Sequence, residues 1–586
     1  MMDPRHLYGT DQPPPTRRRL VAGKAGVTLE NGQLRHLRIG EVEAIRAISF
    51  LVRDRDWGTV QPEIADLKVE AGDQTHVSYR ARYKIGAALL DARIALCLGP
   101  DSLVAEAVAR AHGPVETNRA GFTVLHPIDD VAGAAVRVDH ADGSVEETHF
   151  PGLIEPWQPF KDIVALTHHA SGLKIECRFE GDVFEMEDQR QWGDASFKTY
   201  NRPLALPWPY TIGDGQEIRQ AVRVSWSQAA VPAIVASRAG QAEGGGDFPE
   251  TALLLTASQA REALGRPDDL RRIAPQRLLC HLDSSIGQGL RELRDFAALQ
   301  AALPDPRYDL ELIATCPPEG DLASEFEGHA QNLSASGLVP ASIMVCPAVD
   351  RQSTPPGSAW PPCPPLADIH AAARAAFAGQ VMGGGMASFF PELNRKRPPV
   401  DMLDFVSHGL CPIVHAADDL SVMETLEAVP HILASARAII GAGEYRLGPS
   451  TIAMRQNPYG SRTIPNPGRQ RICMTDNDPR QDGAFAAAWT LGLAASIAKA
   501  GVTVWTPAEL YGPRGLIRAD GSLRPVAAVV QALARLAGQK VGIAGVRDGL
   551  ARLEVGATAL IANLAPDARH GLPPFGWQTV PASSRS

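Results

Sequence analysis

The sequence predicts a multidomain protein of mixed α/β and β class, with an N-terminal β-sandwich, a central (β/α)8 TIM barrel and a small C-terminal β domain. Three observations favour this fold class. The chain has 586 residues, too many for one hydrophobic core. Residues 26–236 alternate apolar and polar side chains with period two, which is typical of strands. Residues 252–540 alternate short apolar runs with amphipathic helices, which is typical of a parallel sheet.

The N-terminal region divides into two parts. Residues 1–25 have neither period and are expected to form a disordered or loosely docked tail. In residues 26–236 the segments HVSYRARYKI, LDARIALCLG and AAVRVDHADGSVEETHF alternate strictly, and ADGS is a hairpin turn candidate. Helical periodicity is nearly absent, so a sandwich of antiparallel sheets is expected.

The central region begins after a linker. Residues 237–251 contain three consecutive glycines among small polar residues. Repeated strand–helix units then predict a closed barrel over residues 252–540, and an open doubly wound sheet is the alternative. No GxGxxG motif follows the first strand, which disfavours a dinucleotide-binding sheet. The eight strand candidates are RLLCHLD, YDLELIATC, ASIMVCP, VMGGGMASFF, MLDFVSHG, EYRLGPSTIAM, RQRICMTDND and VTVWTP.

The last region, residues 541–586, returns to a β pattern, and ARLEVGATALIANLAP is expected to supply two strands.

The composition excludes several classes of protein. A net charge of −9 and a pI near 6.0 disfavour nucleic-acid binding. No apolar run is long enough to span a bilayer, and the N-terminal residues lack the apolar segment of a secretory signal.

The cysteines and histidines point to neither a disulfide framework nor a metal site. The eight cysteines are scattered without a CxxC pair, so buried reduced thiols in a cytoplasmic protein are expected. HExxH, GxSxG and P-loop motifs are absent. His168 and His169 are adjacent and would point to opposite faces of a strand. The sequence therefore points to no metal site and no cofactor, and it leaves a metal requirement and the oligomeric state open.

Polar residues gather at the ends of the predicted barrel strands, where TIM-barrel active sites lie. The candidates are His281 and Asp283 after strand one; Glu392, Asn394 and Arg395 after strand four; His408, His415 and Asp418 after strand five; Ser450 and Arg455 at strand six; Asp476, Asn477 and Asp478 after strand seven; and Glu509 after strand eight.

Several of these residues have a structural interpretation as well. Asp283, Asp418 and Asp478 are also typical caps of following helices, and capping is favoured for Asp418. His408 has the alternative of a hydrogen-bonded barrel histidine. Glu392 follows glycines and aromatic residues, and apolar surroundings would raise the pKa of its carboxyl and suit it to general acid or base chemistry.

One stretch, FEGDVFEMEDQRQWGDASFKTY from Phe179 to Tyr200, crowds charges of both signs among large apolar residues. As a strand it would place Glu185 and Glu187 on one face and Asp188 on the other. We expect it to cap the barrel mouth, with Arg190 or Lys198 holding an oxyanion or a product carboxylate. The alternative is a buried ion-pair cluster that pins two domains together.

Long motifs carry a family resemblance. FEMEDQRQWGDASFKTYNRPLALPWPY, FFPELNR, CPIVHAADDLSVMETLE, MTDNDPRQDGAFAAAWTLG and ELYGPRGL resemble the bacterial D-apionate lactonase family, over roughly Gly26 to Pro566. The resemblance implies hydrolysis of a small-molecule sugar lactone, D-apionolactone, to D-apionate in the catabolism of apiose. The barrel flanked by β domains also resembles retaining glycosidases, but Asp476 stands where those enzymes carry Glu.

Three hypotheses follow. The first is a sugar lactonase with Glu392, His408 and Asp476 as catalytic residues. In it, the substrate-binding residues would be Glu187, Asp188, Arg190, Lys198, Asn394, Arg395, His415, Arg455, Asp478 and Glu509. The second is a furanosidase whose carboxylate pair is Glu392 with Asp476 or Glu509. The third is a non-catalytic carbohydrate-binding protein, which requires no poised acid in the barrel mouth.

Overall fold

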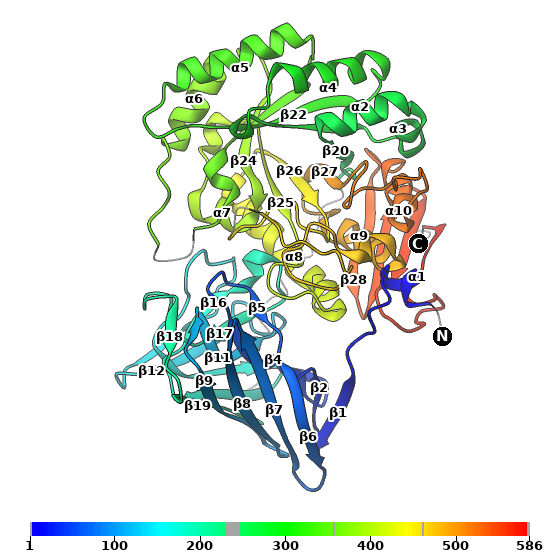
Figure 1. The fold of residues 1–586 in the computed structure, drawn as a ribbon. Helices are drawn as coiled ribbons and strands as arrows, with labels where there is room; N and C mark the ends of the chain where they lie inside the picture. Colours follow the sequence, from blue (N-terminus) through cyan, green and yellow to red (C-terminus); the bar gives the residue numbers. More distant parts are fainter. Residues whose placement is uncertain (1–2, 230–245, 355–357, 460–461, 583–586) are drawn as a thin grey trace.

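The computed structural model describes residues 3–229, 246–354, 358–459 and 462–582. An N-terminal pair of antiparallel sheets lies below a closed eight-stranded barrel, and a four-stranded antiparallel sheet lies beside the barrel (Figure 1). The predicted fold class is therefore confirmed. The predicted linker, residues 237–251, falls mostly outside the described residues, and the exact domain limits 26–236, 252–540 and 541–586 stay predictions.

The N-terminal domain is a sandwich whose first sheet faces the barrel. Its order is β1-β2-β3-β4-β11-β17-β16, with β5 beside β4. The bounds are β1 (Arg17–Ala22), β2 (Ala25–Glu30), β3 (Gln33–Ile39), β4 (Val42–Arg53), β5 (Thr59–Val60), β11 (Arg119–His126), β16 (Glu185–Asp188) and β17 (Phe197–Tyr200).

The second sheet covers the other side of the sandwich core. Its order is β13-β12-β14-β15-β19-β9-β8-β7-β6, and β10 and β18 pair separately. The bounds are β6 (Glu63–Glu70), β7 (Thr75–Ile85), β8 (Ala88–Leu98), β9 (Ser102–His112), β10 (Val115–Thr117), β12 (Ala135–His140), β13 (Val145–His149), β14 (Ile163–Ala170), β15 (Leu173–Glu180), β18 (Tyr210–Ile212) and β19 (Glu217–Gln228).

The alternation of apolar and polar residues along the strands explains why the two sheets pack face to face as a sandwich. Along β7 the buried residues Val77, Tyr79 and Ala81 alternate with more exposed neighbours, and their side chains enter the core between the two sheets. The predicted hairpin at ADGS is confirmed, because Asp139 on β12 pairs with Val145 on β13.

The described residues 3–25 form a short docked helix and a strand, whereas a disordered or loosely docked tail was expected for residues 1–25. Helix α1 (Pro4–Tyr8) is capped by the Asp3 side chain, and the Tyr8 ring packs on Phe485 and Phe575 near the C-terminal sheet. Strand β1 then joins the first sheet. Two apolar residues, Leu7 and Tyr8, are enough to dock this helix, and so short a segment shows no periodicity in the sequence.

The barrel consists of eight parallel strands in chain order. They are β20 (Glu250–Leu255), β21 (Arg277–Asp283), β22 (Arg307–Ala314), β23 (Ser342–Pro347), β24 (Met382–Phe389), β25 (Phe405–Leu410), β26 (Glu444–Ser450) and β27 (Val502–Glu509). Helices surround them: α2 (Ala257–Gly265), α3 (Pro267–Ile273), α4 (Leu290–Ala302), α5 (Leu322–Ser336), α6 (Leu366–Ala376), α7 (Phe390–Lys396), α8 (Asp419–Ile440), α9 (Ala484–Ile497) and α10 (Pro525–Ala534).

Short 3-10 helices occupy several connections: η1 (Gln189–Trp192), η2 (Ser284–Ile286), η3 (Ala348–Arg351), η4 (Val400–Met402) and η5 (Pro479–Asp482). Two strand predictions were wrong. The first barrel strand is β20, and RQRICMTDND is not a barrel strand. In that segment Met474 donates its backbone N–H to Ile413 in another loop, and the chain turns at Cys473 and Met474, where Met474 has a φ of 56°, so the segment does not join the sheet. Glu392 therefore follows the fifth strand, and Asp476 lies in the loop after the seventh.

The three glycines of β24 are required by packing. A Cβ on Gly383 would lie 2.1 Å from the Phe405 ring, and one on Gly385 would lie 2.1 Å from the backbone oxygen of Ser407. Gly385 also has a φ of 109°, a backbone conformation that residues with a side chain rarely adopt. The glycines thus bring β24 close to β25, and they hold the backbone before Glu392 in place.

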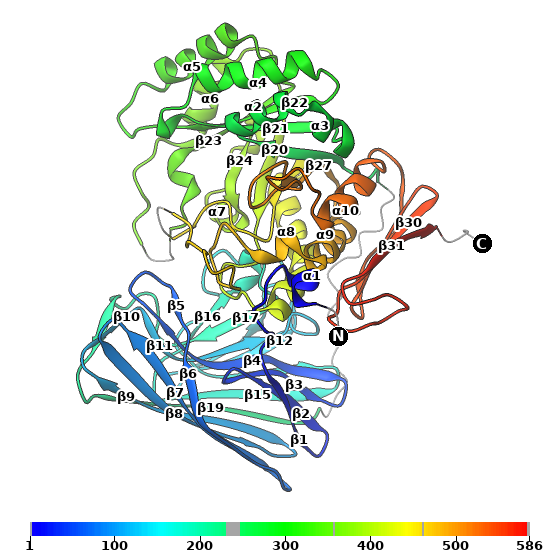
Figure 2. The same ribbon diagram turned by 45° about the vertical axis from the view of Figure 1, so that its right-hand side comes forward.

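The C-terminal sheet contains β28 (Val541–Arg547), β29 (Leu550–Val555), β30 (Thr558–Asn563) and β31 (Trp577–Pro581). The two strands predicted here are confirmed as β29 and β30. The sheet packs against the apolar helix α9 and lies to one side of the barrel (Figure 2). Within the described residues, no helix is both long and apolar enough to cross a membrane.

Candidate active site between the sheet and the barrel

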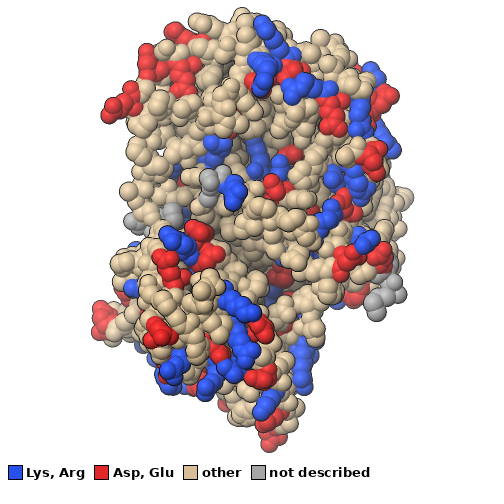
Figure 3. Space-filling model, in the orientation of Figure 1, with Lys and Arg blue, Asp and Glu red and all other residues tan. Residues whose placement is uncertain are grey.

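The carboxyl ends of the barrel strands face the first sheet of the sandwich. The surface is hollowed at this level, and Lys and Arg side chains lie in the hollow (Figure 3). A cavity of about 60 Å³ lies between the two domains. Its walls come from the first sheet and from barrel loops: Arg53, Trp57, Arg119, Glu187, Trp192, Lys198, Leu204, Arg395, Val414, His415, Tyr459 and Met474.

Charge in this cavity is mainly positive. Four cations and one carboxylate line it. The carboxylate, Glu187, lies 2.6 Å from Lys198 Nζ and accepts a 3.0 Å hydrogen bond from Trp192 Nε1. Burial opposes ionisation of Glu187, but Lys198 outweighs it and holds the pKa of Glu187 well below its usual range. Burial lowers the pKa of Lys198, and Arg119 adds to that effect.

A histidine–carboxylate pair opens onto the same cavity. His415 follows β25, and its Nδ1 lies 2.7 Å from Asp194 Oδ2 in the loop between η1 and β17. A carboxylate only accepts, so Nδ1 carries the proton and Nε2 presents a lone pair. Nε2 lies 3.5 Å from the Tyr459 hydroxyl. Burial lowers the pKa of His415 below 6.5, although Asp194 opposes this, so the imidazole is neutral at neutral pH.

Glu392 lies behind this cavity, not in its wall. Its Oε1 accepts 2.6 Å and 3.2 Å hydrogen bonds from Ser353 and Arg395, and Arg395 reaches the cavity. Burial raises the pKa of Glu392, as expected from its apolar surroundings, although Arg395 and Ser353 oppose the shift. Glu392 Oε2 is buried without a hydrogen-bond partner among the described residues. Glu392 thus forms an ion pair with a cavity-lining arginine, and its catalytic role stays a prediction.

The charged stretch from Phe179 to Tyr200 has both of the expected arrangements, because some of its residues border the barrel mouth and others form a buried ion pair. Glu187 and Lys198 line the cavity, whereas Asp188 and Arg190 form a fully buried pair on the other face. Arg190 also binds the backbone oxygens of Pro151 and Gly152. The segment therefore borders the barrel mouth and also contains the internal ion pair that was the alternative.

The structure brings four predicted binding residues together: Glu187, Lys198, Arg395 and His415. Others lie elsewhere. The Asn394 amide donates to the backbone oxygen of Ile154. His408 is fully buried, with Nε2 2.7 Å from the Tyr445 hydroxyl and Nδ1 2.9 Å from the Gly409 oxygen, and burial lowers its pKa to about 4. These contacts match the structural interpretation of His408.

The aspartates of the barrel loops mostly cap helices. Asp418 accepts from the Ser421 N–H at the start of α8, which confirms its predicted cap. Asp478 caps η5 and forms a fully buried pair with Arg480. Asp476 contributes its backbone oxygen to Arg514. Their carboxylates are not in the wall of the cavity.

A second polar group fills the interior of the barrel near its mouth. Arg455 pairs with Glu311, and His281 Nδ1 lies 2.7 Å from the same carboxylate. Burial alone would raise the pKa of Glu311, but Arg455 and His281 hold it at about 2. Glu509 accepts a 2.7 Å hydrogen bond from Arg514. Arg455, Glu311 and His281 thus satisfy one another, and Arg514 holds Glu509.

Several residues of the candidate site were not predicted from the sequence. Asp194 and Trp192 belong to the charged stretch that drew attention, but no local pattern links Asp194 to His415. Arg53 and Arg119 lie on regular strands, where an arginine usually faces solvent. Only the packing of the sheet onto the barrel places them at a site.

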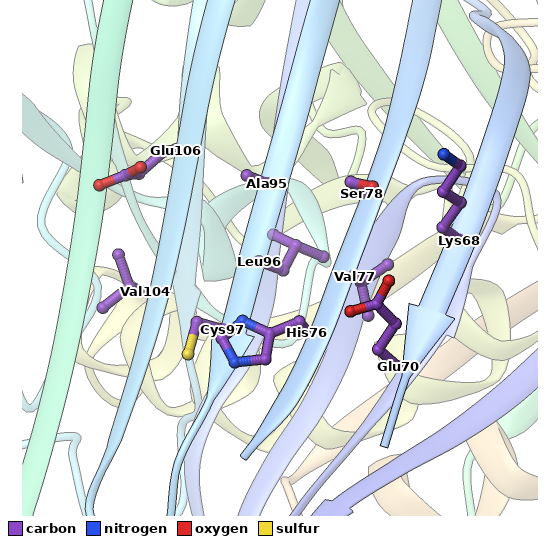
Figure 4. Close-up of a pocket in the computed structure, with 10 residues that line it drawn as sticks. All are labelled: Lys68, Glu70, His76, Val77, Ser78, Ala95, Leu96, Cys97, Val104 and Glu106. Atoms are coloured by element: carbon purple, nitrogen blue, oxygen red, sulfur yellow. The ribbon is translucent and has the colours of Figure 1, made fainter. Parts of the chain in front are cut away.

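A larger groove of about 400 Å³ lies on the outer face of the second sheet. Its charged side chains, Lys68, Glu70 and Glu106, are spread over β6 and β9, with His76 and Cys97 between them (Figure 4). They do not converge on one point. Among the described residues no cluster of His, Cys, Asp or Glu is arranged to hold a metal ion, and all eight cysteines are free thiols.

Two domain models of one protein family match this chain. The D-apionate lactonase N-terminal domain matches residues 5–229, and the D-apionate lactonase TIM barrel domain matches residues 251–538. A D-apionate lactonase of Brucella anthropi is 46% identical over 555 residues, covering 92% of this chain and 90% of the relative.

The solved structures that resemble this chain are less similar to it in sequence than the Brucella relative is. A GH30 endoxylanase of Clostridium papyrosolvens is 8% identical with a TM-score of 0.34, over 55% of this chain and 82% of that one. A GH36 α-galactosidase of Geobacillus stearothermophilus is 9% identical with a TM-score of 0.29, over 93% and 91% of the two chains. The two family domains and the Brucella relative together span most of the sequence. The chain belongs to the D-apionate lactonase family.

Proposed function

We propose that this protein hydrolyses a sugar lactone, D-apionolactone, to D-apionate in the catabolism of apiose, and that the reaction takes place in the cavity between the first sheet and the barrel. Family membership supports the reaction. The observation that carries the site is the pairing of His415, which lines a cavity rich in cations, with the carboxylate of Asp194. Lactone opening needs a base for water, a cation for the developing oxyanion and a proton for the leaving oxygen.

His415 is the general base of this proposal. Its neutral Nε2 accepts a proton from water while the water oxygen attacks the lactone carbonyl carbon. Asp194 fixes the tautomer and stabilises the imidazolium that forms. Asp194 is therefore a positioning residue, and a positioned base of this kind contributes about 10²–10⁴-fold to the rate.

Lys198 and Arg395 supply positive charge for the tetrahedral oxyanion. Glu187 holds Lys198, and Glu392 holds Arg395, so each cation is oriented before the substrate arrives. The intermediate then collapses. The bond from the carbonyl carbon to the ring oxygen breaks, and the imidazolium returns its proton to that oxygen. The acid product ionises at neutral pH, so each turnover releases one proton.

The aromatic walls suit a sugar ring. Trp57, Trp192 and Tyr459 line the cavity, and aromatic faces pack well on the apolar C–H face of a carbohydrate. The ligand is thus a small-molecule sugar lactone. The free thiols are typical of a reducing compartment, so we place the reaction in the cytoplasm.

Proton release with D-apionolactone tests the proposed reaction. The wild type is expected to accelerate proton release well above the spontaneous rate, and a furanoside should release no sugar. Rapid furanoside cleavage with only spontaneous lactone opening would overturn the proposal and favour a glycosidase.

A further inference from the structure

Two arginines in the cavity wall have an arrangement that is energetically unfavourable in a β-sheet. Arg53 on β4 and Arg119 on β11 are direct cross-strand partners. Both are buried, at 8% and 5% exposure, and both line the cavity. Like charges directly opposite each other destabilise a sheet, and a buried charge ordinarily has a partner of opposite sign.

No carboxylate pairs with either arginine within the described residues. Arg53 Nη1 donates only to the backbone oxygen of Trp57 and to the Thr59 hydroxyl. The Arg119 guanidinium lies 3.7 Å from the centre of the Tyr200 ring, and its buried Nε has no hydrogen-bond partner. Burial lowers the pKa of Arg53, and the charge of Arg119 adds to this effect, against a smaller opposing effect of Asp194.

The other two cations of the cavity are different. Lys198 has Glu187, and Arg395 has Glu392. Within the described residues, Arg53 and Arg119 are therefore the two cavity cations that form no ion pair. An external anion would supply the missing partner, and a guanidinium pair fits the two oxygens of a carboxylate.

We propose that Arg53 and Arg119 form a carboxylate-binding site for the open-chain aldonate product, on the sheet side of the cavity. This inference rests on the proposed function. The lactone substrate is neutral and gains nothing from the pair. When the ring opens, the lactone carbonyl group becomes a carboxylate. This carboxylate then binds the two arginines. The enzyme therefore retains its product and is inhibited competitively by aldonates.

Calorimetric titration of the full-length protein with D-apionate tests this site. We expect binding to the wild type and about 10–100-fold weaker binding to Arg119→Gln and to Arg53→Gln, because each change removes charge-assisted hydrogen bonds. Arg93→Gln is the matched control. It removes the same charge from an exposed position on β8, in the second sheet, and should bind D-apionate as the wild type does.

A thermal shift separates binding from folding. D-apionate should raise the Tm of the wild type and of Arg93→Gln, and should raise the Tm of Arg119→Gln much less. Equal D-apionate affinity in the wild type and Arg119→Gln would overturn the inference. Binding of inorganic phosphate in place of D-apionate would overturn the assignment to a carboxylate.

The proposed reaction and the carboxylate site can be refuted independently of each other. If the wild type binds D-apionate through both arginines but does not open the lactone, the carboxylate site stands and the reaction is refuted. If the lactone is opened but D-apionate neither binds nor competes, the carboxylate site is refuted and the reaction stands.

Discussion

The buried pair of Asp188 and Arg190 is predicted to stabilise the fold without taking part in turnover. Both side chains are 0% exposed, and two hydrogen bonds of 2.8 and 2.7 Å join them. Removing one partner of such a pair costs about 3–5 kcal/mol. In Asp188→Asn, Arg190 keeps its bonds to Pro151 and Gly152, so the lower end, about 3 kcal/mol, is expected.

Differential scanning calorimetry measures this loss. For a cooperative unit of about 200 residues, 1 kcal/mol corresponds to about 2–4 °C, so the transition of the N-terminal domain should fall by about 6–12 °C. The turnover of the folded Asp188→Asn variant should stay within about twofold of the wild type, because no transition-state contact is lost.

Glu187→Gln is the matched control, since it changes the next residue on the opposite face of β16. It releases Lys198 in the cavity wall and should lower kcat/KM for the lactone. A stable Asp188→Asn variant that loses turnover would refute this division of roles.

Three further predictions follow from single residues. The kcat/KM for the lactone should be constant above the pKa of His415 and fall as the pH drops through it, at a midpoint below 6.5, because only the neutral imidazole accepts a proton; a pH–rate profile measures this. Burial opposes protonation of His36, but Glu424 and Glu43 raise its pKa to about 9, so the stabilisation it provides is complete below about 6.5 and lost as the pH rises through 9. The Tm measured from pH 6 to 10 should fall more steeply in the wild type than in His36→Gln. Gly385→Ala should fail to fold or lose several degrees of Tm, since its Cβ would meet the Ser407 oxygen at 2.1 Å.

Much of the fold is present in local sequence patterns. Strict alternation predicted strands such as β7 and the β12–β13 hairpin, and repeated strand–helix units predicted the barrel. Strand β20 was missed because its apolar run directly follows the glycine-rich linker. RQRICMTDND was misassigned because a loop with a few apolar residues and a short strand have similar apolar patterns, and the turn at Cys473 and Met474 is not visible in that pattern.

The site was less predictable for a physical reason. His415 could be selected because it follows a barrel strand, but its partner Asp194 lies 221 residues earlier, in another domain. Arg53 and Arg119 meet because β4 pairs with β11, strands that are not consecutive in the chain. Such pairings depend on sheet order and domain docking, which no local period encodes.

The most direct test of the proposed site compares kcat for D-apionolactone in His415→Gln and Glu392→Gln, measured by proton release on folded protein. The dyad mechanism predicts that His415→Gln loses about 10²–10⁴-fold, whereas Glu392→Gln, which can still accept hydrogen bonds from Ser353 and Arg395, loses less than about tenfold. A Glu392→Gln variant without turnover, beside a His415→Gln variant near the wild-type rate, would contradict the account and place the base on α7.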